Sequence, residues 1–199
     1  MNLKDIHTIY FIGIGGIGMS ALARYFFTIG KYVAGYDKTR NRITTDLEKL
    51  GIQIHFNDSL GLIPENFKYK NTTLVVYTPA VSSDHSELKF FTNNGFLVMK
   101  RAEVLGLITK DTFCFAVAGT HGKTTTSAVL GHIMQPYNAT SFLGGISENY
   151  GSNLILGADK ISVVEADEYD KSFLNLSPNI ACITSMDADH LDIYGDHSA

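Results

Sequence analysis

The chain is poor in the residues that hold disulfide-rich secreted proteins together. Its 199 residues include two cysteines, four prolines and no tryptophan. Two cysteines cannot form the disulfide framework that stabilises a small secreted domain. Cys114 and Cys182 each lie within an apolar, strand-like run. We therefore predict that both are buried free thiols in a reducing compartment, rather than a disulfide or a metal-binding pair.

Excess basic charge and long apolar runs are also missing. The formal net charge is -4 and the isoelectric point is near 5.9, so there is no basic surface of the kind that attracts nucleic acid. No apolar run approaches the ~20 residues that a membrane helix needs. The short apolar stretch near the N-terminus is broken by glycines, and no small-residue cleavage site follows it. We expect a cytoplasmic protein with neither a nucleic-acid nor a membrane partner.

Short β-branched runs alternate with helical patterns, which indicates an α/β protein with parallel sheets. We expect strands at 8–12, 32–36, 52–56, 72–80 and 96–99, and helices at 17–29, 44–51, 86–93 and 101–109. The pattern then restarts with an apolar run at 113–119 and a helix whose apolar stripe holds Thr126, Val129, Leu130, Ile133 and Met134. We predict a parallel-sheet domain at 1–108, followed at 109–199 by the start of a second α/β domain.

The first glycine motif, GIGGIG, follows a strand directly and precedes a helix. Gly13 permits a tight turn, Gly15 lets the backbone approach a pyrophosphate, and Gly18 allows close packing of helix on strand. Unpaired N–H groups at the helix start would hold the anion. Asp37, at the end of the second strand, is placed to bind a ribose hydroxyl. The candidate ligand-binding residues are Gly13, Gly15, Gly16, Ile17, Gly18, Met19, Ser20 and Asp37. The motif does not distinguish a nicotinamide cofactor from another diphosphate, and a purely structural turn is the alternative.

The second glycine motif, AGTHGKTTTS, is a shortened phosphate-binding loop. The usual pattern has a glycine five residues before the glycine of the Gly-Lys pair, but that position holds Val117 and the nearest glycine is Gly119. Backbone N–H groups can still surround phosphates, Lys123 can reach the β- and γ-oxygens, and the Thr124 hydroxyl can bind Mg²⁺. The candidate nucleotide-binding residues are Gly119, Thr120, His121, Gly122, Lys123, Thr124 and Thr125. A helix start with a solvent-facing lysine is the alternative.

Two later strands end in acidic residues. Glu165 follows the apolar run ISVV, and a carboxylate at the carboxyl end of such a strand commonly holds magnesium opposite a phosphate loop. The neighbouring Asp167, Glu168 and Asp170 can equally form a solvated acidic turn. His190, in the cluster DADHLD after the next strand, is the histidine that we assign to the site. His7, His55, His85 and His197 are interpreted as structural.

Taken together, these motifs resemble the Mur ligases of bacterial cell-wall synthesis. The resemblance rests on GIGGIGMSALA, TPAVSSDHSEL, AGTHGKTTT and EADEYDKSFLNLSPNIACITSMDADHLDIYG, and it covers essentially the whole chain. Members of this family use the shortened GTHGKT loop, which accounts for Val117. Within the family, these segments are more similar in sequence to the branch that adds L-alanine than to the branch that recycles murein tripeptide.

The resemblance implies an ATP-dependent, Mg²⁺-dependent ligase acting on UDP-N-acetylmuramate and L-alanine. ATP would phosphorylate the lactyl carboxylate, and the amine of alanine would attack the resulting acyl phosphate. By resemblance, the catalytic residues are Lys123, Glu165 and His190, and the metal ligands are Thr124, Glu165 and His190. The GIGGIG turn would hold the UDP diphosphate. The resemblance also implies that residues 1–108 are a Rossmann-like UDP-sugar-binding domain and that residues 109–199 are the start of a P-loop-type α/β ATP-binding domain, which is truncated here.

Family members are longer than this sequence, so we expect the chain by itself to bind the UDP-sugar weakly and to be inactive. Two other classes stay open. An NAD-dependent oxidoreductase would explain GIGGIG and Asp37 but not the second loop. A non-catalytic nucleotide-binding module would act on neither UDP-N-acetylmuramate nor L-alanine.

Overall fold

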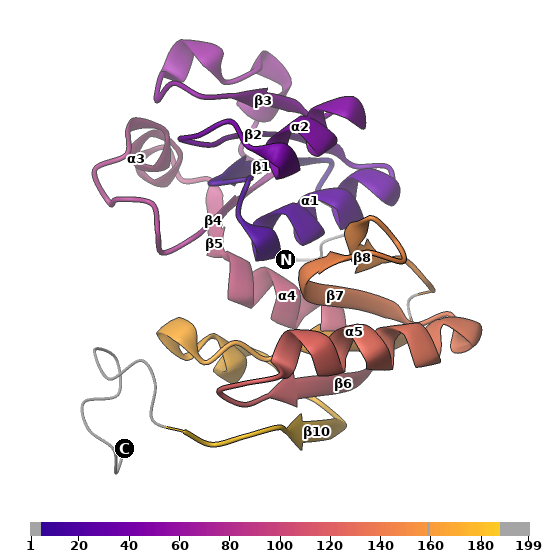
Figure 1. Cartoon of the computed structure of the whole chain (residues 1–199). Helices are drawn as coiled ribbons and strands as arrows, with labels where there is room; N and C mark the ends of the chain where they lie inside the picture. The colour runs from indigo at the N-terminus through magenta and orange to yellow at the C-terminus, as the bar shows by residue number, and fades with distance from the viewer. Residues whose placement is uncertain (1–4, 159, 188–199) are drawn as a thin grey trace. The chain divides into compact units, whose positions relative to one another are not determined.

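The computed structural model describes residues 5–158 and 160–187. The chain divides into two compact units, residues 1–101 and 102–199. The division falls at the start of helix α4 (Arg101–Thr109), whereas the sequence pattern placed the boundary at the end of that helix. Each unit is built around its own five-stranded sheet, and both sheets carry helices (Figure 1). The predicted α/β class is confirmed.

The sheet of the first unit is wholly parallel, with the order β3-β2-β1-β4-β5. Its strands are β1 (Thr8–Ile12), β2 (Tyr32–Tyr36), β3 (Gln53–His55), β4 (Thr73–Tyr77) and β5 (Leu97–Lys100). All five residues of β1 are buried, because this strand is central and apolar on both faces. The chain reverses its direction of progress across the sheet between β1 and β4, which is where doubly wound folds bind ligands at the carboxyl ends of the strands.

Helices cover both faces of this sheet. They are α1 (Ile17–Thr28), α2 (Arg42–Lys49) and α3 (Ser86–Asn93), with short 3-10 turns η2 (Leu60–Leu62) and η3 (Glu65–Phe67). Phe11 of β1 contacts Phe26 of α1 on one face, while Tyr10 contacts Phe67 and Phe91 on the other. Alternate residues of one strand therefore belong to two separate apolar layers.

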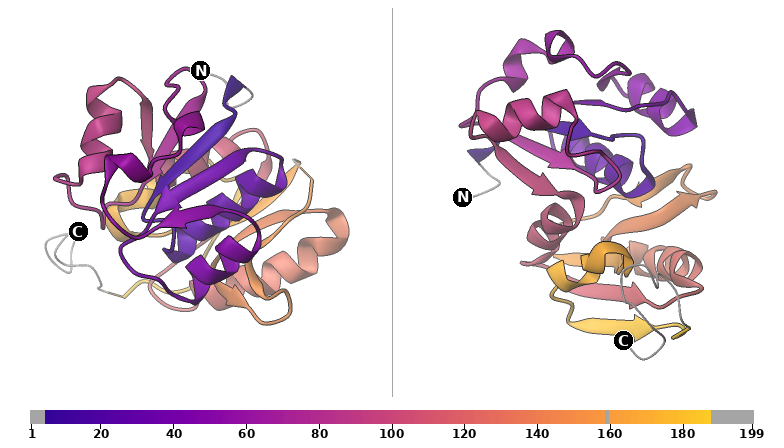
Figure 2. Two further views of the ribbon diagram at one scale, coloured as in Figure 1. Left: turned by 90° about the horizontal axis from the view of Figure 1, so that it is seen from above. Right: turned by 90° about the vertical axis from the view of Figure 1, so that its left-hand side faces the viewer.

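The second unit has a mixed sheet with the order β10-β6-β9-β7-β8. Its strands are β6 (Phe113–Ala118), β7 (Thr140–Ser147), β8 (Ser152–Ile155), β9 (Ile161–Glu165) and β10 (Ile180–Ile183). Only the β7–β8 pair is antiparallel among the described pairs. Helix α5 (Lys123–Met134) packs on β6, β9 and β7, and the short turns η4 (Gln135–Tyr137) and η5 (Tyr169–Asn175) complete the unit. Figure 2 shows β10, in yellow, beside β6.

Two expectations about burial in this unit are wrong. The core-facing residues of α5 are Ser127 and Gly131, while Val129 and Ile133 of the expected apolar stripe are 54% and 58% exposed. Small residues are needed there because a Cβ at position 131 would lie 2.8 Å from the Ser141 hydroxyl, so helix and strand are in close contact. Cys114 is buried as expected, but Cys182 is exposed on the edge strand β10; both thiols are free.

Candidate functional site

The shortened phosphate loop joins β6 to α5, as the sequence predicted. Gly119 and Gly122 have φ angles of 123° and 80°, which are left-handed conformations that favour glycine. Gly122 occupies the N-cap of α5 without a side-chain cap, and the first helical bond runs from Thr126 N–H to Gly122 O at 2.9 Å. The N–H groups of Lys123, Thr124 and Thr125 therefore have no acceptor within the helix. Together with the helix dipole they form a site suited to an anion.

The loop is supported by the segment that follows β10. Thr120 N–H donates to Ser185 O at 3.2 Å, His121 N–H donates to Ser185 Oγ at 2.9 Å, and the Thr120 hydroxyl pairs with the backbone of Asp187 at 2.9 Å. Thr184 Oγ1 donates to His121 O. Two N–H groups that the sequence assigned to phosphate binding are thus used to fix the shape of the loop. The anion-facing donors come instead from the first turn of α5.

The Lys123 side chain turns back over the loop. Its ammonium donates to Gly119 O at 2.6 Å, to Thr120 O at 3.4 Å and to Glu168 Oε1 at 2.7 Å. The side chains of Lys123 and Glu168 are 14% and 23% exposed. Glu168 is therefore an ion-pair partner of the loop lysine, rather than a member of a solvated acidic turn.

Glu165 lies against the first turn of α5, at the carboxyl end of β9. Its Oε1 accepts from the Thr124 hydroxyl at 3.1 Å, and its Oε2 accepts from Gly144 N–H at 3.0 Å and from the Ser127 hydroxyl at 3.4 Å. The structure thus brings together the predicted pair Thr124 and Glu165. Ser127 and Gly144 were missed by the sequence analysis, although Ser127 lies one helical turn after Thr124 in the quoted motif.

The spacing of this pair fits a magnesium ion. Mg²⁺ binds oxygen ligands at 2.0–2.1 Å in octahedral geometry, so two adjacent ligands lie about 3 Å apart. Thr124 Oγ1 and Glu165 Oε1 are separated by 3.1 Å. Within residues 5–158 and 160–187, no group of three His, Cys, Asp or Glu side chains is arranged to hold a metal. The two oxygens therefore form part of an ion's coordination shell and leave the remaining positions to other ligands. The predicted ligand His190 lies outside the described residues.

The GIGGIG turn joins β1 to α1 in the first unit. Gly13, with φ of 90°, donates its N–H to Tyr36 O at 2.8 Å. Gly15 N–H donates to Asp37 Oδ2 at 2.7 Å, and a Cβ at this position would lie 2.9 Å from the same oxygen. The absence of a side chain on Gly15 thus permits close contact with Asp37. Asp37 is at the predicted place, but one of its oxygens is held by the turn itself.

The first turn of α1 differs from the sequence prediction in one respect. A Cβ on Gly18 would lie 2.9 Å from the Arg101 side chain, so this glycine makes room for an arginine rather than for helix-on-strand packing. The side chains of Met19 and Ser20 are buried, and the Ser20 hydroxyl donates to Ile17 O at 2.9 Å. A ligand contact by Met19 would therefore use the backbone, whereas the Ser20 N–H already donates to Gly16 O at 2.8 Å. Gly16 is the N-cap of α1 and has no side-chain cap.

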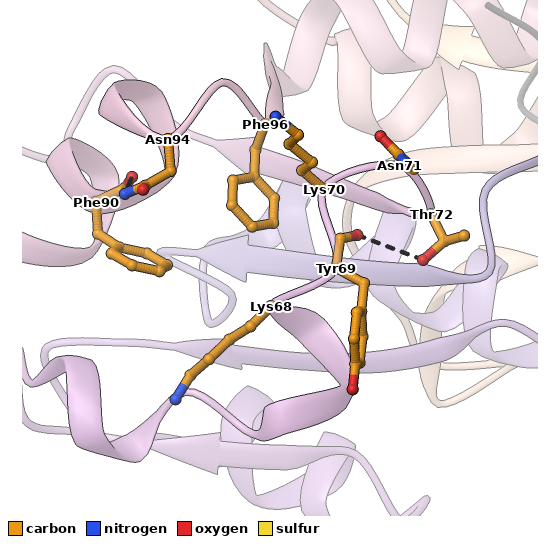
Figure 3. Close-up of a pocket in the computed structure, with 8 residues that line it drawn as sticks. All are labelled: Lys68, Tyr69, Lys70, Asn71, Thr72, Phe90, Asn94 and Phe96. Carbon is orange, nitrogen blue, oxygen red and sulfur yellow. Dashed lines mark hydrogen bonds between the residues drawn. The ribbon is translucent and has the colours of Figure 1, made fainter.

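A cavity of about 650 Å³ opens elsewhere on the first unit (Figure 3). Thr72, which precedes β4 and accepts from the N–H of Thr8, places this cavity at the amino ends of the strands, away from the GIGGIG turn. Its lining residues are Lys68, Tyr69, Lys70, Asn71, Thr72, Phe90, Asn94 and Phe96. No residue that the sequence assigned to a site lies among them.

Both glycine turns lie at the carboxyl ends of parallel strands in an α/β fold, which is where proteins of this general class commonly bind ligands. Family comparisons define the class further. Residues 8–112 match the model described as "Mur ligase family, catalytic domain", and residues 117–199 match "Mur ligase middle domain". The chain belongs to the Mur ligase family, which confirms the resemblance seen in the sequence.

Named relatives agree with this assignment. The chain is 64% identical to a UDP-N-acetylmuramate–L-alanine ligase of Flavobacterium psychrophilum and 62% identical to one of Flavobacterium johnsoniae, over the whole chain but 45% and 44% of those proteins. The crystal structure of the corresponding Thermotoga maritima ligase matches 96% of the chain and 44% of its own, with a TM-score of 0.84 and 35% identity. The crystal structure of a UDP-N-acetylmuramate:L-alanyl-gamma-D-glutamyl-meso-diaminopimelate ligase from Neisseria meningitides matches 97% of the chain and 64% of its own, with a TM-score of 0.85 and 27% identity. The chain spans less than half the length of the alanine ligases that it matches.

Proposed function

We propose that residues 1–199 are the N-terminal part of a cytoplasmic ligase that joins L-alanine to the carboxylate of UDP-N-acetylmuramate at the expense of ATP. The observation that carries the proposal is the 3.1 Å contact of Thr124 with Glu165 at the start of α5, beside Lys123. The two substrates are proposed from the names of the relatives. ATP would supply the phosphoryl group that turns the carboxylate into an acylating agent.

In the second unit, each site residue has a separate role. The unpaired N–H groups at the start of α5 bind the terminal phosphates, and Lys123 neutralises their charge. Thr124 and Glu165 hold Mg²⁺, while Ser127 and Gly144 keep the Glu165 carboxylate in place. His190 stays proposed as a further metal ligand. Charge neutralisation and alignment of this kind are the main contributions that proteins make to phosphoryl transfer.

In the first unit, we assign the diphosphate of the UDP-sugar to the GIGGIG turn. The uncapped N-terminus of α1 faces the carboxyl edge of the sheet, and no acidic residue occurs in its first turn. Binding requires the Gly15 N–H, now bonded to Asp37, to turn to a phosphate oxygen. Asp37 Oδ2 can then accept from a ribose hydroxyl, while Oδ1 accepts from Thr39 N–H at 3.0 Å.

The proposed function is tested with the protein at the length of its relatives. UDP-N-acetylmuramate, L-alanine and Mg-ATP should give ADP, phosphate and the alanyl product, measured by phosphate release and mass spectrometry. Product formation with murein tripeptide but not with alanine would favour the recycling ligase instead. Binding of NADH without any response to the UDP-sugar would contradict both.

The metal role of Thr124 leads to the first prediction. Thr124→Val keeps the shape of the side chain but removes the hydroxyl, whereas Thr124→Ser keeps the hydroxyl. We expect Thr124→Val to lower the rate of ATP-dependent ligation roughly tenfold to a hundredfold and to raise the Mg²⁺ concentration needed for half-maximal rate. Thr124→Ser should stay close to the parent. Equal behaviour of the two variants in a Mg²⁺ titration would contradict the assignment.

A further inference from the structure

The ion pair of Glu168 with Lys123 is not explained by a metal site or by the packing of the core. Glu168 is the N-cap of η5, and its own carbonyl accepts from Lys171 N–H at 3.1 Å, so its backbone position is fixed. Its side chain reaches from this fixed point to the phosphate loop, 45 residues earlier in the chain, and contacts Lys123 at 2.7 Å. The pair is three-quarters or more shielded from water on both sides. Such a pair is stronger than an exposed one.

The number of N–H donors on Lys123 limits how many acceptors it can bind at once. An ammonium has three N–H groups. In this structure they serve Gly119 O, Thr120 O and Glu168 Oε1. A phosphate oxygen can therefore bind Lys123 only by replacing one of these acceptors. Two of them belong to the same loop as the lysine and are neutral.

Glu168 is the acceptor that a phosphate would displace. It comes from another segment, and it is negatively charged, so an arriving triphosphate repels it while attracting the lysine. Displacement would also move the Glu168 carboxylate away from the start of α5, where the negatively charged carboxylate of Glu165 already lies. Charge thus favours exchange at Glu168 over exchange at either carbonyl.

We propose that Glu168 is a positioning residue that holds Lys123 over its own loop and yields it to the terminal phosphates of ATP. The inference rests on the proposed function, because it requires a triphosphate at the start of α5. It makes Glu168 a competitor of the nucleotide rather than a ligand for it. Removing the carboxylate should therefore improve nucleotide binding, which is the opposite of what loss of a binding residue does.

The test uses Glu168→Gln in the protein at the length of its relatives, with Mg-ATP as the probe. We expect the dissociation constant of Mg-ATP, measured by calorimetry, to fall roughly three- to tenfold, and the KM for ATP to fall while that for alanine does not. Glu168→Asp keeps the charge on a shorter side chain and should lie between the parent and Glu168→Gln. Glu148→Gln removes an exposed carboxylate from the same unit and should match the parent.

A second measurement does not depend on nucleotide binding. Lys123 should react slowly with an amine-acylating reagent in the parent, because three acceptors enclose its ammonium, and several-fold faster in Glu168→Gln, as followed by peptide mass spectrometry. Unchanged labelling, or unchanged or weaker binding of Mg-ATP by Glu168→Gln, overturns the inference. Failure of the parent protein to bind Mg-ATP would contradict the proposed function as well. If the parent binds Mg-ATP and Lys123→Ala does not, the proposed function is supported whatever the result for Glu168→Gln.

Discussion

At the scale of single residues, three hydrogen bonds hold the Glu165 carboxylate of the second unit in place. Glu165 accepts hydrogen bonds from one backbone N–H and two hydroxyls, which come from β7 and α5. Gly144 is essential to this arrangement because a Cβ at that position would overlap the carboxylate. The glycine is thus part of the site although it contributes no side chain.

This contact gives a direct prediction. Gly144→Ala should push the Glu165 carboxylate away from Thr124 and lower the rate of ATP-dependent ligation about ten- to a hundredfold, because small displacements at a reacting centre are costly. Gly61→Ala is the control, since a Cβ there would meet only Ser59 Oγ at 3.9 Å. A normal ligation rate and a normal thermal melt of Gly144→Ala would contradict the prediction, because they would mean that ligation tolerates a displaced Glu165 carboxylate.

At the scale of elements, the helices differ in how the N–H groups of their first turns are satisfied. Helix α2 starts at a capping box, in which Asn41 Oδ1 accepts from Thr44 N–H and the Thr44 hydroxyl accepts from Asn41 N–H, both at 2.9 Å. Helices α1 and α5 start at glycines without any side-chain cap. Both of these helices follow a glycine motif. Helix α3 also lacks a cap from its own N-cap residue, but its Ser86 N–H donates to Asp58 Oδ2 at 2.9 Å. An uncapped helix N-terminus is suited to an anion.

The capping box can be tested separately from function. Asn41→Ala removes the acceptor for Thr44 N–H and should cost about 1 kcal/mol of unfolding free energy, which lowers the melting temperature of the unit by about 4–8 °C. Asn41→Asp keeps an acceptor at the same place and should melt near the parent temperature. Circular dichroism during heating measures both. Equal melting of all three proteins would mean that the cap does not contribute.

At the scale of the whole molecule, each unit is stabilised by contacts between residues far apart in the chain. In the first unit, the Tyr10 hydroxyl donates to Glu87 Oε2 at 2.8 Å and lies 2.7 Å from His55 Nε2, which is 3.3 Å from Glu87 Oε1. His55 Nδ1 faces the carbonyl of Asn57 at 3.0 Å and so must carry a proton. Tyr10 Oη, His55 Nε2 and the Glu87 carboxyl group then need one proton beyond that of the tyrosine, because otherwise two lone pairs would face each other. Burial raises the pKa of Glu87 to about 7, which matches a shared proton here.

This buried group predicts a pH dependence of stability. A carboxyl whose pKa rises from 4.5 to about 7 on folding stabilises the native state below pH 4.5 and loses that contribution as the pH rises through 7. Glu87→Gln removes the titration, so the parent should lose on the order of 1–3 kcal/mol relative to this variant between pH 4.5 and 8. Comparing the two proteins cancels most of the contribution of the nearby His55, His85 and Asp58. Urea unfolding at several pH values gives the difference, and the exposed Glu65→Gln is the control. A difference that does not change with pH would contradict the prediction.

Part of the fold and of the candidate site could be predicted from the amino-acid sequence. The strands and helices of the first unit, the elements β6, α5, β9 and β10 of the second, and the pair Thr124 and Glu165 follow from local patterns. The strands β7 and β8 do not, because the segment 142–153 is rich in Gly, Asn and Ser and is typical of a loop. Periodicity and backbone conformation are properties of short segments, and parallel strands bring their carboxyl ends to one edge, so motifs at those ends meet. Among the described residues of the chain, no helix is both long and apolar enough to cross a membrane.

The rest depended on which distant segments meet. The pairing of Lys123 with Glu168, the support of the phosphate loop by Ser185 and the close approach of Gly144 to Glu165 join residues 21–65 positions apart, and no local pattern signals them. For the same reason, the expected apolar stripe of α5 was misplaced, because the helix lies so close to β7 that only small side chains fit. Local sequence specifies where each element and turn forms, whereas packing selects which N–H groups, carboxylates and ammonium groups are left to bind a ligand.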